Sequence, residues 1–476
     1  MKVSLLYPGI TECGFNSLNG NEGSWMNHGL AMLSAALKQK GHQTDLIDLR
    51  RLTGWQDYRR AVGDLDSQAV GITMMSVDFD AACESARILK ELRPDIKVFV
   101  GGPHASICPQ ELEPLDCFDC VVKAEGETTF PQLIEDLESG RDVPRLVDGQ
   151  RLDNLDDAPW ADRDLFQCPE EPFVPFLEPP FVTLIAGRGC RYNCNYCQPA
   201  ERLIFGRHVR RRSVDNVVDE LQFLREKYAF RSFMVHDDCL TEDPAWVRSF
   251  CSKLARANIR TPFVAQSRAD LICRHPDMMV ALRDAGLRLI IIGFESGSDR
   301  ILKFLRKGCT RAKNLEAAGI ARSLGIKIWA NYMLGLPTET KEEVLETVSM
   351  LEEIRPYHCS PAFYTPHPGS DLFSMGQEMG IHLISDHTSY RRNTYEPKIK
   401  GPDYDFLHQV LSRTVALGQD NQPASLQPGA SDAERISRRL RIRNGLKVAL
   451  MRFPRLYRTV KRVRSHPLTR RVTSRN

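Results

Sequence analysis

The chain has 476 residues, of which 42% are hydrophobic, and a net charge of +3. Its length predicts more than one domain, its apolar content excludes wholesale disorder, and no apolar run reaches the roughly 18 residues of a membrane-spanning helix. The charge is unevenly spread. Residues 435–476 contain 15 Lys or Arg and no Asp or Glu, which leaves a net charge of −12 on the other 434 residues. The sequence therefore joins an acidic body to a strongly basic tail.

The N-terminus and the cysteine content indicate where the chain works. The first apolar stretch, residues 3–7, is too short for a signal peptide and instead predicts a strand. The chain has 14 cysteines, and without an export signal we expect reduced thiols and a cytoplasmic location. In that setting, cysteines that lie close together in sequence usually bind metal or take part in catalysis.

Residues 1–140 alternate short β-branched runs with helical patterns. The predicted strands are 3–7, 44–48, 69–74, 98–101 and 120–123. The two clearest helices are 29–40 and 80–92. This alternation predicts a flavodoxin-like, doubly wound parallel sheet, whose ligands bind at the carboxyl ends of the strands. Residues 141–180 contain seven prolines and no clear periodicity, which predicts a proline-rich linker.

A second α/β region occupies residues 181–370. The predicted strands are 182–186, 232–235, 263–267, 289–294, 326–333 and 361–364, and the helices between them are 214–228, 244–255, 276–285, 312–324 and 341–354. Six βα units in this length favour a partial (β/α)6 TIM-like barrel over a second open sheet. Residues 371–432 are predicted to form a helical extension with a polar linker, and residues 433–476 a helical, basic amphipathic tail.

Three closely spaced cysteines directly follow the first predicted barrel strand. They are Cys190, Cys194 and Cys197, within the run Gly-Cys-Arg-Tyr-Asn-Cys-Asn-Tyr-Cys. Tetrahedral zinc usually takes four protein ligands, and a [4Fe–4S] cluster normally takes four thiolates. Three thiolates would leave one iron open to a ligand that reacts. The alternatives are three structural cysteines, or a zinc knuckle that a distant residue completes.

This CxxxCxxC motif, with Tyr196 before its last cysteine, resembles that of the radical S-adenosylmethionine (SAM) superfamily. The resemblance covers about residues 181–370. Five further strand-end motifs stand in the family's order: His236-Asp237-Asp238, Gln266-Ser267-Arg268, Gly293-Phe294-Glu295-Ser296-Gly297-Ser298, Asn331-Tyr332-Met333-Leu334-Gly335-Leu336-Pro337 and Tyr364-Thr365-Pro366-His367-Pro368-Gly369. The resemblance implies a [4Fe–4S] cluster on the three cysteines that reductively cleaves SAM.

Polar residues at the strand ends are the candidates for holding SAM. They are Tyr196, Asp237, Gln266, Arg268, Glu295 and Ser296. The Arg268 guanidinium offers a fork that suits a carboxylate, and the others suit an amine or ribose hydroxyls. For each residue taken alone, a solvated loop or a structural ion pair is the alternative.

The N-terminal region resembles the cobalamin-binding domain of one large class of radical SAM enzymes. The matching segments include Gly101-Gly102-Pro103-His104 and Glu125-Gly126-Glu127, and the resemblance makes Gly101, Gly102, Glu125 and Gly126 cofactor-binding candidates. The DxHxxG motif, whose histidine would ligate cobalt, is absent. We interpret His28 and His104 as loop histidines rather than cobalt ligands. The alternative is a degenerate domain that only shapes the substrate cavity.

These resemblances imply a cobalamin-dependent radical SAM methyltransferase acting on an unactivated carbon of a small molecule, a secondary metabolite or a lipid. Reduction of the cluster implies an electron donor such as flavodoxin or ferredoxin. The alternatives are a cyclase or oxidative rearrangement enzyme of the anaerobic porphyrin cyclase type, a tRNA-modifying radical SAM enzyme, and a cobalamin carrier or sensor without catalysis.

The basic tail has three interpretations. A basic amphipathic stretch suits an anionic membrane surface, which predicts peripheral attachment at the inner face of the membrane. Nucleic acid and the enzyme's own acidic body are the other two partners that the charge would suit. Because the motifs for catalysis lie in residues 1–370, the tail is needed only for placement of the enzyme.

Overall fold

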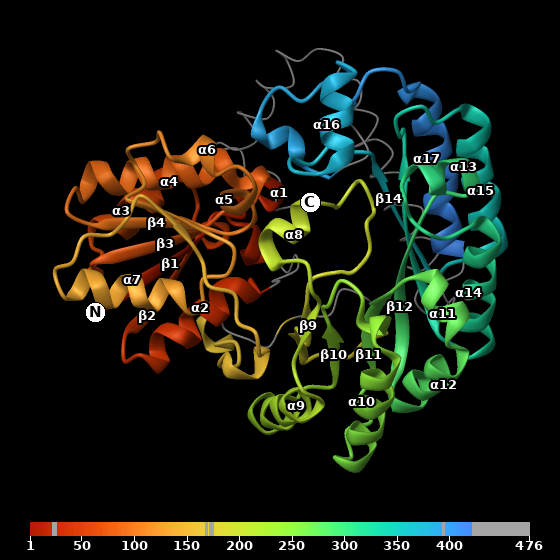
Figure 1. Ribbon diagram of the computed structural model, residues 1–476, viewed down its shortest axis with the longest axis horizontal. Helices are drawn as coiled ribbons and strands as arrows, with labels where there is room; N and C mark the ends of the chain where they lie inside the picture. The colour runs from red at the N-terminus through yellow and green to blue at the C-terminus, as the bar shows by residue number, and fades with distance from the viewer. Residues whose placement is uncertain (21–25, 167–169, 171–175, 393–395, 421–476) are drawn as a thin grey trace, which may run out of the picture. The chain divides into compact units, whose positions relative to one another are not determined.

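The structure is a computed structural model that describes residues 1–20, 26–166, 170, 176–392 and 396–420 (Figure 1). It contains two six-stranded sheets in which all neighbouring strands are parallel. The protein therefore has an α/β fold with two parallel sheets, as the alternation of strand and helix patterns predicted. The polar linker beyond residue 420 and the basic tail predicted at 433–476 lie outside the described residues.

The first sheet has the strand order β2-β1-β3-β4-β5-β6. Its strands are β1 (Lys2–Tyr7), β2 (Gln43–Asp48), β3 (Ala69–Thr73), β4 (Lys97–Gly101), β5 (Cys120–Lys123) and β6 (Leu146–Asp148). The helices of this region are α1 (Ile10–Cys13), α2 (His28–Gln39), α3 (Trp55–Gly63), α4 (Phe79–Leu92), α5 (Pro103–Ile107), α6 (Pro109–Leu112) and α7 (Thr129–Glu138). The chain reverses its direction of winding between β1 and β3, where ligands of such sheets bind.

Neighbouring side chains of β1 pack into separate cores on the two faces of this sheet. Leu5 belongs to a core with residues of α2 and α7, and Leu6 belongs to one with residues of α3 and α4. This follows from the period of two along a strand. The sheet is thus covered by helices on both faces.

Strand β6 corrects the prediction that residues 141–180 only link two domains. It pairs in parallel with β5, with Val121 opposite Leu146. Two of its three side chains are exposed, so neither an apolar run nor an alternating pattern marked it in the sequence. The segment adds an edge strand to the first sheet before it continues toward the second.

The second sheet has the order β14-β13-β12-β11-β10-β7, which follows the chain. Its strands are β7 (Phe181–Leu184), β10 (Ser232–Val235), β11 (Phe263–Ser267), β12 (Leu287–Glu295), β13 (Lys327–Leu334) and β14 (His358–Phe363). Strands β7 and β14 form its two edges. Within the described residues the sheet therefore does not close, which agrees with a partial barrel.

Helices follow these strands in turn. They are α8 (Ala200–Phe205), α9 (Val214–Tyr228), α10 (Pro244–Arg256), α11 (Ala269–Arg274), α12 (Pro276–Ala285), α13 (Asp299–Phe304), α14 (Arg311–Ser323), α15 (Lys341–Ile354), α16 (Asp371–Glu378) and α17 (Tyr404–Asp420). A two-stranded antiparallel ribbon joins β8 (Gly187–Arg188) to β9 (Arg210–Arg211). Short 3-10 helices complete the fold: η1 (Ser17–Gly20), η2 (Leu49–Arg51), η3 (Ser76–Asp78), η4 (Leu155–Asp157), η5 (Arg163–Phe166), η6 (Leu240–Glu242) and η7 (His387–Tyr390).

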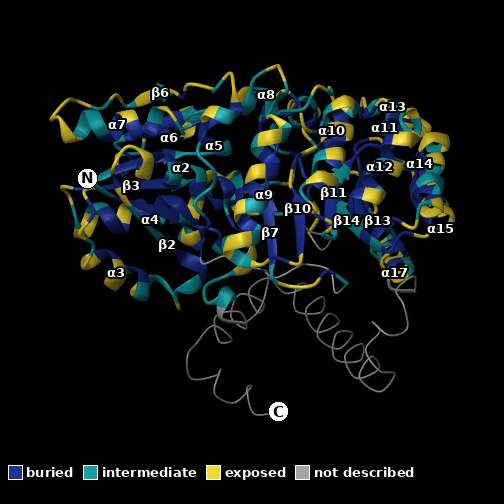
Figure 2. Ribbon diagram, turned by 90° about the horizontal axis from the view of Figure 1, so that it is seen from below, coloured by how far each residue is buried: buried dark blue, intermediate teal, exposed yellow. Residues whose placement is uncertain are grey.

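Side chains on the second sheet also alternate between two environments. On β12, Ile290 and Ile292 pack against the helices in the large core, whereas Leu289 and Ile291 join a smaller cluster on the opposite face. Figure 2 shows β7 and β10 of this sheet as buried ribbon, whereas β13 and β14 are partly of intermediate burial. The inner face and the carboxyl ends of the strands are left to form a site, as in other barrels of this type.

Local signals fix where the helices begin. Ser213 accepts a hydrogen bond from Asn216 N at the start of α9, as expected for an N-cap. Thr340 and Glu343 form a reciprocal capping box at the start of α15. No helix in the described part of the chain is both long enough and apolar enough to cross a bilayer.

Candidate active site and cofactor cavities

The three cysteines line one cavity of about 510 Å³ at the carboxyl ends of the second sheet. Four of the six SAM-binding candidates line it as well: Tyr196, Gln266, Arg268 and Glu295. They come from the cysteine loop and from the ends of β11 and β12. The structure therefore brings together residues that are as much as 105 positions apart in the sequence.

The cysteine loop is held in place by backbone and side-chain hydrogen bonds. Cys197 N and Gln198 N both donate to Cys194 O, at 3.1 and 2.9 Å. Asn195 donates through its backbone to Leu305 O and through Nδ2 to Phe304 O at 2.8 Å. The loop is thus folded tightly around Cys194 and is fastened to the end of α13.

Burial raises the pKa of two of the cysteine thiols, and the pKa of Cys197 reaches about 12. Metals bind cysteine as thiolate, so a metal that enters this loop displaces protons from these thiols. Three thiols that face open space in one cavity fit a cluster with one iron free of protein ligands. This donor set and the adjacent polar groups fit the [4Fe–4S] cluster and SAM that the motif implies.

Glu295 is the centre of a buried polar group beside the cysteines. Tyr196 Oη donates to Glu295 Oε1 at 3.1 Å, and Lys307 Nζ donates to the same oxygen at 2.8 Å. Lys307 Nζ also donates to Tyr196 Oη at 3.2 Å. The Glu295 backbone has a φ of 63°, and a Cβ added to Gly293 would overlap the Glu295 carboxylate. Position 293 therefore requires glycine, because any side chain there would collide with the Glu295 carboxylate.

Arg268 faces a cysteine while much of its guanidinium is held by the protein. Nη1 lies 3.6 Å from Cys194 Sγ, and Nε donates to Asp270 at 2.9 Å. Nη2 donates to Lys307 O, and the guanidinium lies 3.5 Å from the centre of the Tyr192 ring. The sequence suggested that two nitrogens of the Arg268 guanidinium bind the SAM carboxylate. In the structure Nε and Nη2 donate to protein groups, so Nη1 is the nitrogen that faces the cysteines.

Two sequence candidates do not line the cavity. Asp237 accepts from Ala186 N at 2.7 Å and pairs with Arg211 at 3.1 Å, so it fastens the end of β7. Ser296 lies toward α15, with its Oγ 3.3 Å from Thr347 Oγ1. Glu295 therefore reaches the cavity while Ser296 faces the helices, at a point where the backbone of Glu295 leaves the extended conformation with a φ of 63°.

The structure adds a carboxyl pair that the sequence reasoning missed. Asp238 and Glu201 both line the cysteine cavity. Burial, followed by the charge and hydrogen bond of Asp238, raises the pKa of Glu201 to about 8, and burial raises the pKa of Asp238 to about 6. The acidic pair after β10 drew attention to Asp237, but alternation along the chain places Asp238 at the cavity.

A second cavity of about 370 Å³ lies at the carboxyl ends of the first sheet. All four candidates for cobalamin binding line it: Gly101, Gly102, Glu125 and Gly126. Much of the rest of its wall is apolar, with contributions from Leu33, Ile72, Phe99, Val100 and Phe130. An apolar cavity with polar groups at its margin suits a large ring system that carries polar substituents.

Two glycines keep this second cavity open. Gly102 has a φ of 97°, and a Cβ there would lie 3.0 Å from backbone atoms of Met74. A Cβ on Gly126 would lie 3.0 Å from Leu33 Cδ2. Both positions therefore exclude larger residues and let the backbone approach a bound group closely. The residues present fit the cobalamin that this domain type implies.

His28 and His104 lie differently relative to the second cavity. His28 lines the second cavity but its Nε2 lies 2.8 Å from Thr183 Oγ1. His104 lies outside that lining, at the end of a separate group of polar side chains. Neither histidine is presented to the cavity as a free imidazole.

Beside the second cavity, buried ion pairs join the loop after β5 of the first sheet to the two-stranded ribbon of β8 and β9, which flanks the three cysteines. Arg188, on β8, pairs with Glu125 at 2.9 Å and with Glu127 at 2.6 Å, and Arg210, on β9, also pairs with Glu125. Asp238 lines both cavities. The two cavities therefore meet at one carboxyl group, and β8, which precedes the cysteines, lines the second cavity.

Comparison with protein families matches both parts of the chain. Residues 184–351 match the radical SAM superfamily, and residues 21–134 match the B12 binding domain. The chain is 27% identical over 413 residues to an uncharacterized methyltransferase of Pyrococcus horikoshii, covering 84% of this chain and 88% of that protein. It is also 27% identical over 438 residues to the anaerobic magnesium-protoporphyrin IX monomethyl ester cyclase of Rubrivivax gelatinosus, covering 87% and 76%.

Solved structures show the same fold. The radical SAM methyltransferase TsrM from Kitasatospora setae, with cobalamin and a [4Fe–4S] cluster bound, superposes with a TM-score of 0.64 at 16% identity, over 87% of this chain and 88% of that one. The cysteine cavity is lined mainly by residues of the radical SAM match, and the second cavity mainly by residues of the B12-binding match. The chain therefore contains a B12-binding domain followed by a radical SAM domain.

Proposed function

We propose that this protein is a cobalamin-dependent radical SAM methyltransferase that acts on an unactivated carbon of a small molecule. The observation that carries the proposal is the meeting of the two cavities at Asp238. A methyl group carried in the cavity at the first sheet would have to reach a substrate radical in the cysteine cavity at the second sheet. Asp238 marks the place where these two cavities touch. The methyltransferase relatives support the same activity.

When bound, the [4Fe–4S] cluster supplies the electron that cleaves SAM, and cobalamin supplies the methyl group. The chain's own residues hold and orient these groups. We assign Cys190, Cys194 and Cys197 to the cluster. Tyr196 and Glu295 present a fixed hydroxyl and carboxylate oxygen beside it, and these suit the SAM amine and hydroxyls.

Gly101, Gly102, Glu125 and Gly126 are assigned to cobalamin. The glycines allow close approach of the backbone, and the ion pairs with Arg188 and Arg210 fix Glu125 at the wall of the cavity. The strand order β2-β1-β3-β4-β5 is that of flavodoxin-like domains, which bind their cofactor at the β1/β3 switch point.

The substrate would enter where the edge strand β14 meets the cysteine cavity. Ser360, Pro361, Ala362, Phe363 and Tyr364 line this part of the wall. The mixture of apolar and hydroxyl side chains suits a small molecule with an unactivated carbon, whether a secondary metabolite or a lipid. A flavodoxin or ferredoxin would supply the electron. The basic tail would attach the enzyme to an anionic membrane surface, and this part of the proposal rests on charge alone.

The test uses the anaerobically reconstituted holoenzyme with SAM labelled in its methyl group. The expected product carries the labelled methyl and has gained the mass of one CH₂ group, with 5′-deoxyadenosine formed in step. A substrate that is oxidised or cyclised without gaining the label would overturn the methyltransferase assignment and support cyclase chemistry, as in the Rubrivivax relative. Transfer of the labelled methyl group by enzyme without bound cobalamin would exclude the B12-dependent part.

A further inference from the structure

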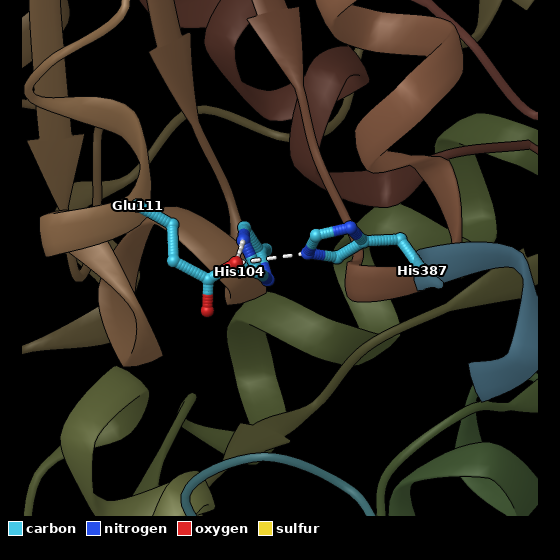
Figure 3. A group of neighbouring side chains, drawn as sticks. All are labelled: His104, Glu111 and His387. Carbon is cyan, nitrogen blue, oxygen red and sulfur yellow. Dashed lines mark hydrogen bonds and ion pairs between the residues drawn. The ribbon is translucent and has the colours of Figure 1, made fainter. Parts of the chain in front are cut away.

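A group of three metal-ligand side chains lies away from both cavities. His104 is on α5, Glu111 is on α6, and His387 begins η7 in the extension after the barrel. Figure 3 shows them pointing toward one another, with two from the first domain and one from the extension. Neither the cluster nor cobalamin uses any of them.

The ligand atoms have the spacing of one coordination sphere. His387 Nε2 lies 2.8 Å and His104 Nε2 lies 3.8 Å from Glu111 Oε2, and all three ligand atoms are within 4.8 Å of one another. Tetrahedral zinc with bonds of about 2.0–2.1 Å places neighbouring ligand atoms about 3.3 Å apart. The two distances to Glu111 Oε2 lie about 0.5 Å on either side of that spacing.

His104 supplies an independent observation that points to a ligand. Its side chain is 0% exposed, yet Nε2 makes no hydrogen bond. The other ring nitrogen lies 3.0 Å from Ser76 Oγ, which fixes the ring's orientation. A buried polar nitrogen without a hydrogen bond costs roughly 1–3 kcal/mol. A metal bound at Nε2 would remove that cost, and a second hydrogen bond to Nδ1 is the usual support of a metal-bound histidine.

The surroundings restrict the movement of the two imidazoles. Phe79 stacks on the His387 ring at 3.8 Å between centres and meets the His104 ring edge-on at 5.2 Å. The aromatic ring thus holds both imidazoles beside Glu111.

We propose that His104, Glu111 and His387 bind one Zn²⁺ ion, with water in the fourth position, and that this ion fastens the extension after the barrel to the first domain. Two histidines and one carboxylate are a ligand set that zinc commonly takes. Glu111 is exposed, so the fourth position is open to solvent.

The role we infer is a cross-link in which water takes the place of the fourth protein ligand that structural zinc sites usually have. Arg391, four residues after His387, also donates to Glu12 O in the first domain. The extension is therefore already directed toward this domain by a second contact. A metal that joins α5, α6 and η7 would link Glu111 to His387, which are 276 positions apart in the chain. Helices α5 and α6 directly follow Gly102, which lines the second cavity.

The test must separate this site from the cysteine loop, because free cysteines also bind zinc. It therefore uses the untagged, full-length holoenzyme with its iron content measured, and adds Zn²⁺ alone after treatment with a mild chelator. The expected result is one Zn²⁺ per chain retained with unchanged iron. Glu111→Gln and His387→Ala should each weaken Zn²⁺ binding by at least about tenfold.

Matched controls keep the result interpretable. Glu113→Gln changes an exposed carboxylate two residues from Glu111, and His208→Ala removes an exposed histidine from another surface. Both controls should bind Zn²⁺ like the wild type. In a background with Cys190, Cys194 and Cys197 all replaced by Ala, one Zn²⁺ per chain should remain. Failure of that background to bind Zn²⁺, or equal binding by Glu111→Gln and the wild type, would overturn the proposal.

Hydrogen exchange supplies a readout that does not depend on enzyme activity. Adding Zn²⁺ should slow exchange in residues 387–391 of the wild type and leave it unchanged in Glu111→Gln. Equal exchange with and without Zn²⁺ in the wild type would contradict the structural role. Because this site lies outside the two cofactor cavities, its failure would leave the methyltransferase proposal intact, and failure of methyl transfer would leave Zn²⁺ binding intact.

Discussion

Lys307 Nζ donates to Glu295 Oε1 at 2.8 Å, and both side chains are almost fully buried beside the three cysteines. The ion pair holds the carboxylate at the end of β12 in a fixed position next to Tyr196. A buried pair of this kind contributes little compared with an apolar pair, but loss of one partner leaves an uncompensated charge. Lys307 therefore positions Glu295 rather than adding net stability.

We expect Lys307→Met to lower the free energy of unfolding by about 3–5 kcal/mol at neutral pH, because Glu295 would remain buried without its partner. Affinity for SAM should fall as well, since the carboxylate is no longer held. Urea unfolding and SAM binding measure the two effects. Lys303→Met, an exposed lysine four residues earlier, is the control and should change stability by less than about 0.5 kcal/mol. Equal effects of the two variants would refute the role of Lys307.

Replacement of any one of Cys190, Cys194 and Cys197 by Ala should abolish the iron–sulfur cluster. The wild type should take up about four irons per chain on reconstitution, because a cluster of this type contains four. Iron analysis and visible absorption measure the loss. Cys239→Ala is the matched control: Cys239 lines the same cavity, with its Sγ 3.6 Å from Thr241 Oγ1. If Cys239→Ala lost the cluster as completely, the assignment of three ligands would be wrong.

Gly102→Ala should weaken cobalamin binding, because a Cβ there lies 3.0 Å from the backbone of Met74 and would shift the loop at the cavity. The backbone has a φ of 97°, so strain of about 1–2 kcal/mol is also expected. Gly140→Ala is a close control, since its φ is 72° but nothing lies within 4 Å of the added Cβ. Both variants should lose stability, and only Gly102→Ala should lose cobalamin affinity, measured by absorption titration. Loss of affinity in both would point to a general effect of unfolding.

The sequence predicted those parts of the site whose chemistry lies in one short segment. Cys190, Cys194, Cys197 and Tyr196 lie within eight residues of one another, so their spacing alone defines a ligand loop. Lys307 carries no such signal. It reaches Tyr196, 111 positions away, only because α13 returns the chain to the cysteine loop, and nothing in the local sequence marks that contact.

The errors of detail have a similar origin. The acidic pair Asp237-Asp238 was recognised, but which carboxylate faces the cavity depends on the exact residue at which β10 ends. A shift of one residue exchanges the two sides. Strand β6 was missed because a three-residue edge strand buries too little to impose a pattern. His104 was interpreted as an ordinary loop histidine, and only the fold shows its buried Nε2 beside Glu111 and His387.

The last prediction concerns the pH dependence of stability at α15. The hydrogen bond from Arg300 lowers the pKa of Glu343 to about 2, from an unfolded value of 4.5. The carboxylate therefore stabilises the fold fully above pH 4.5, and that contribution is lost as the pH falls from about 4.5 to 2. Glu343→Gln should cost about 1 kcal/mol at pH 7 through the lost ion pair with Arg300, because glutamine can still form the capping box.

The difference between Glu343→Gln and the wild type should shrink as the pH is lowered through this range, because the wild-type side chain becomes neutral there too. Urea unfolding at pH 7, 5 and 4 follows the beginning of that decrease. Glu346→Gln, an exposed position on the same helix, should show no such dependence. A destabilisation by Glu343→Gln that stayed constant over this range would mean that packing of the side chain, rather than its charge, stabilises the start of α15.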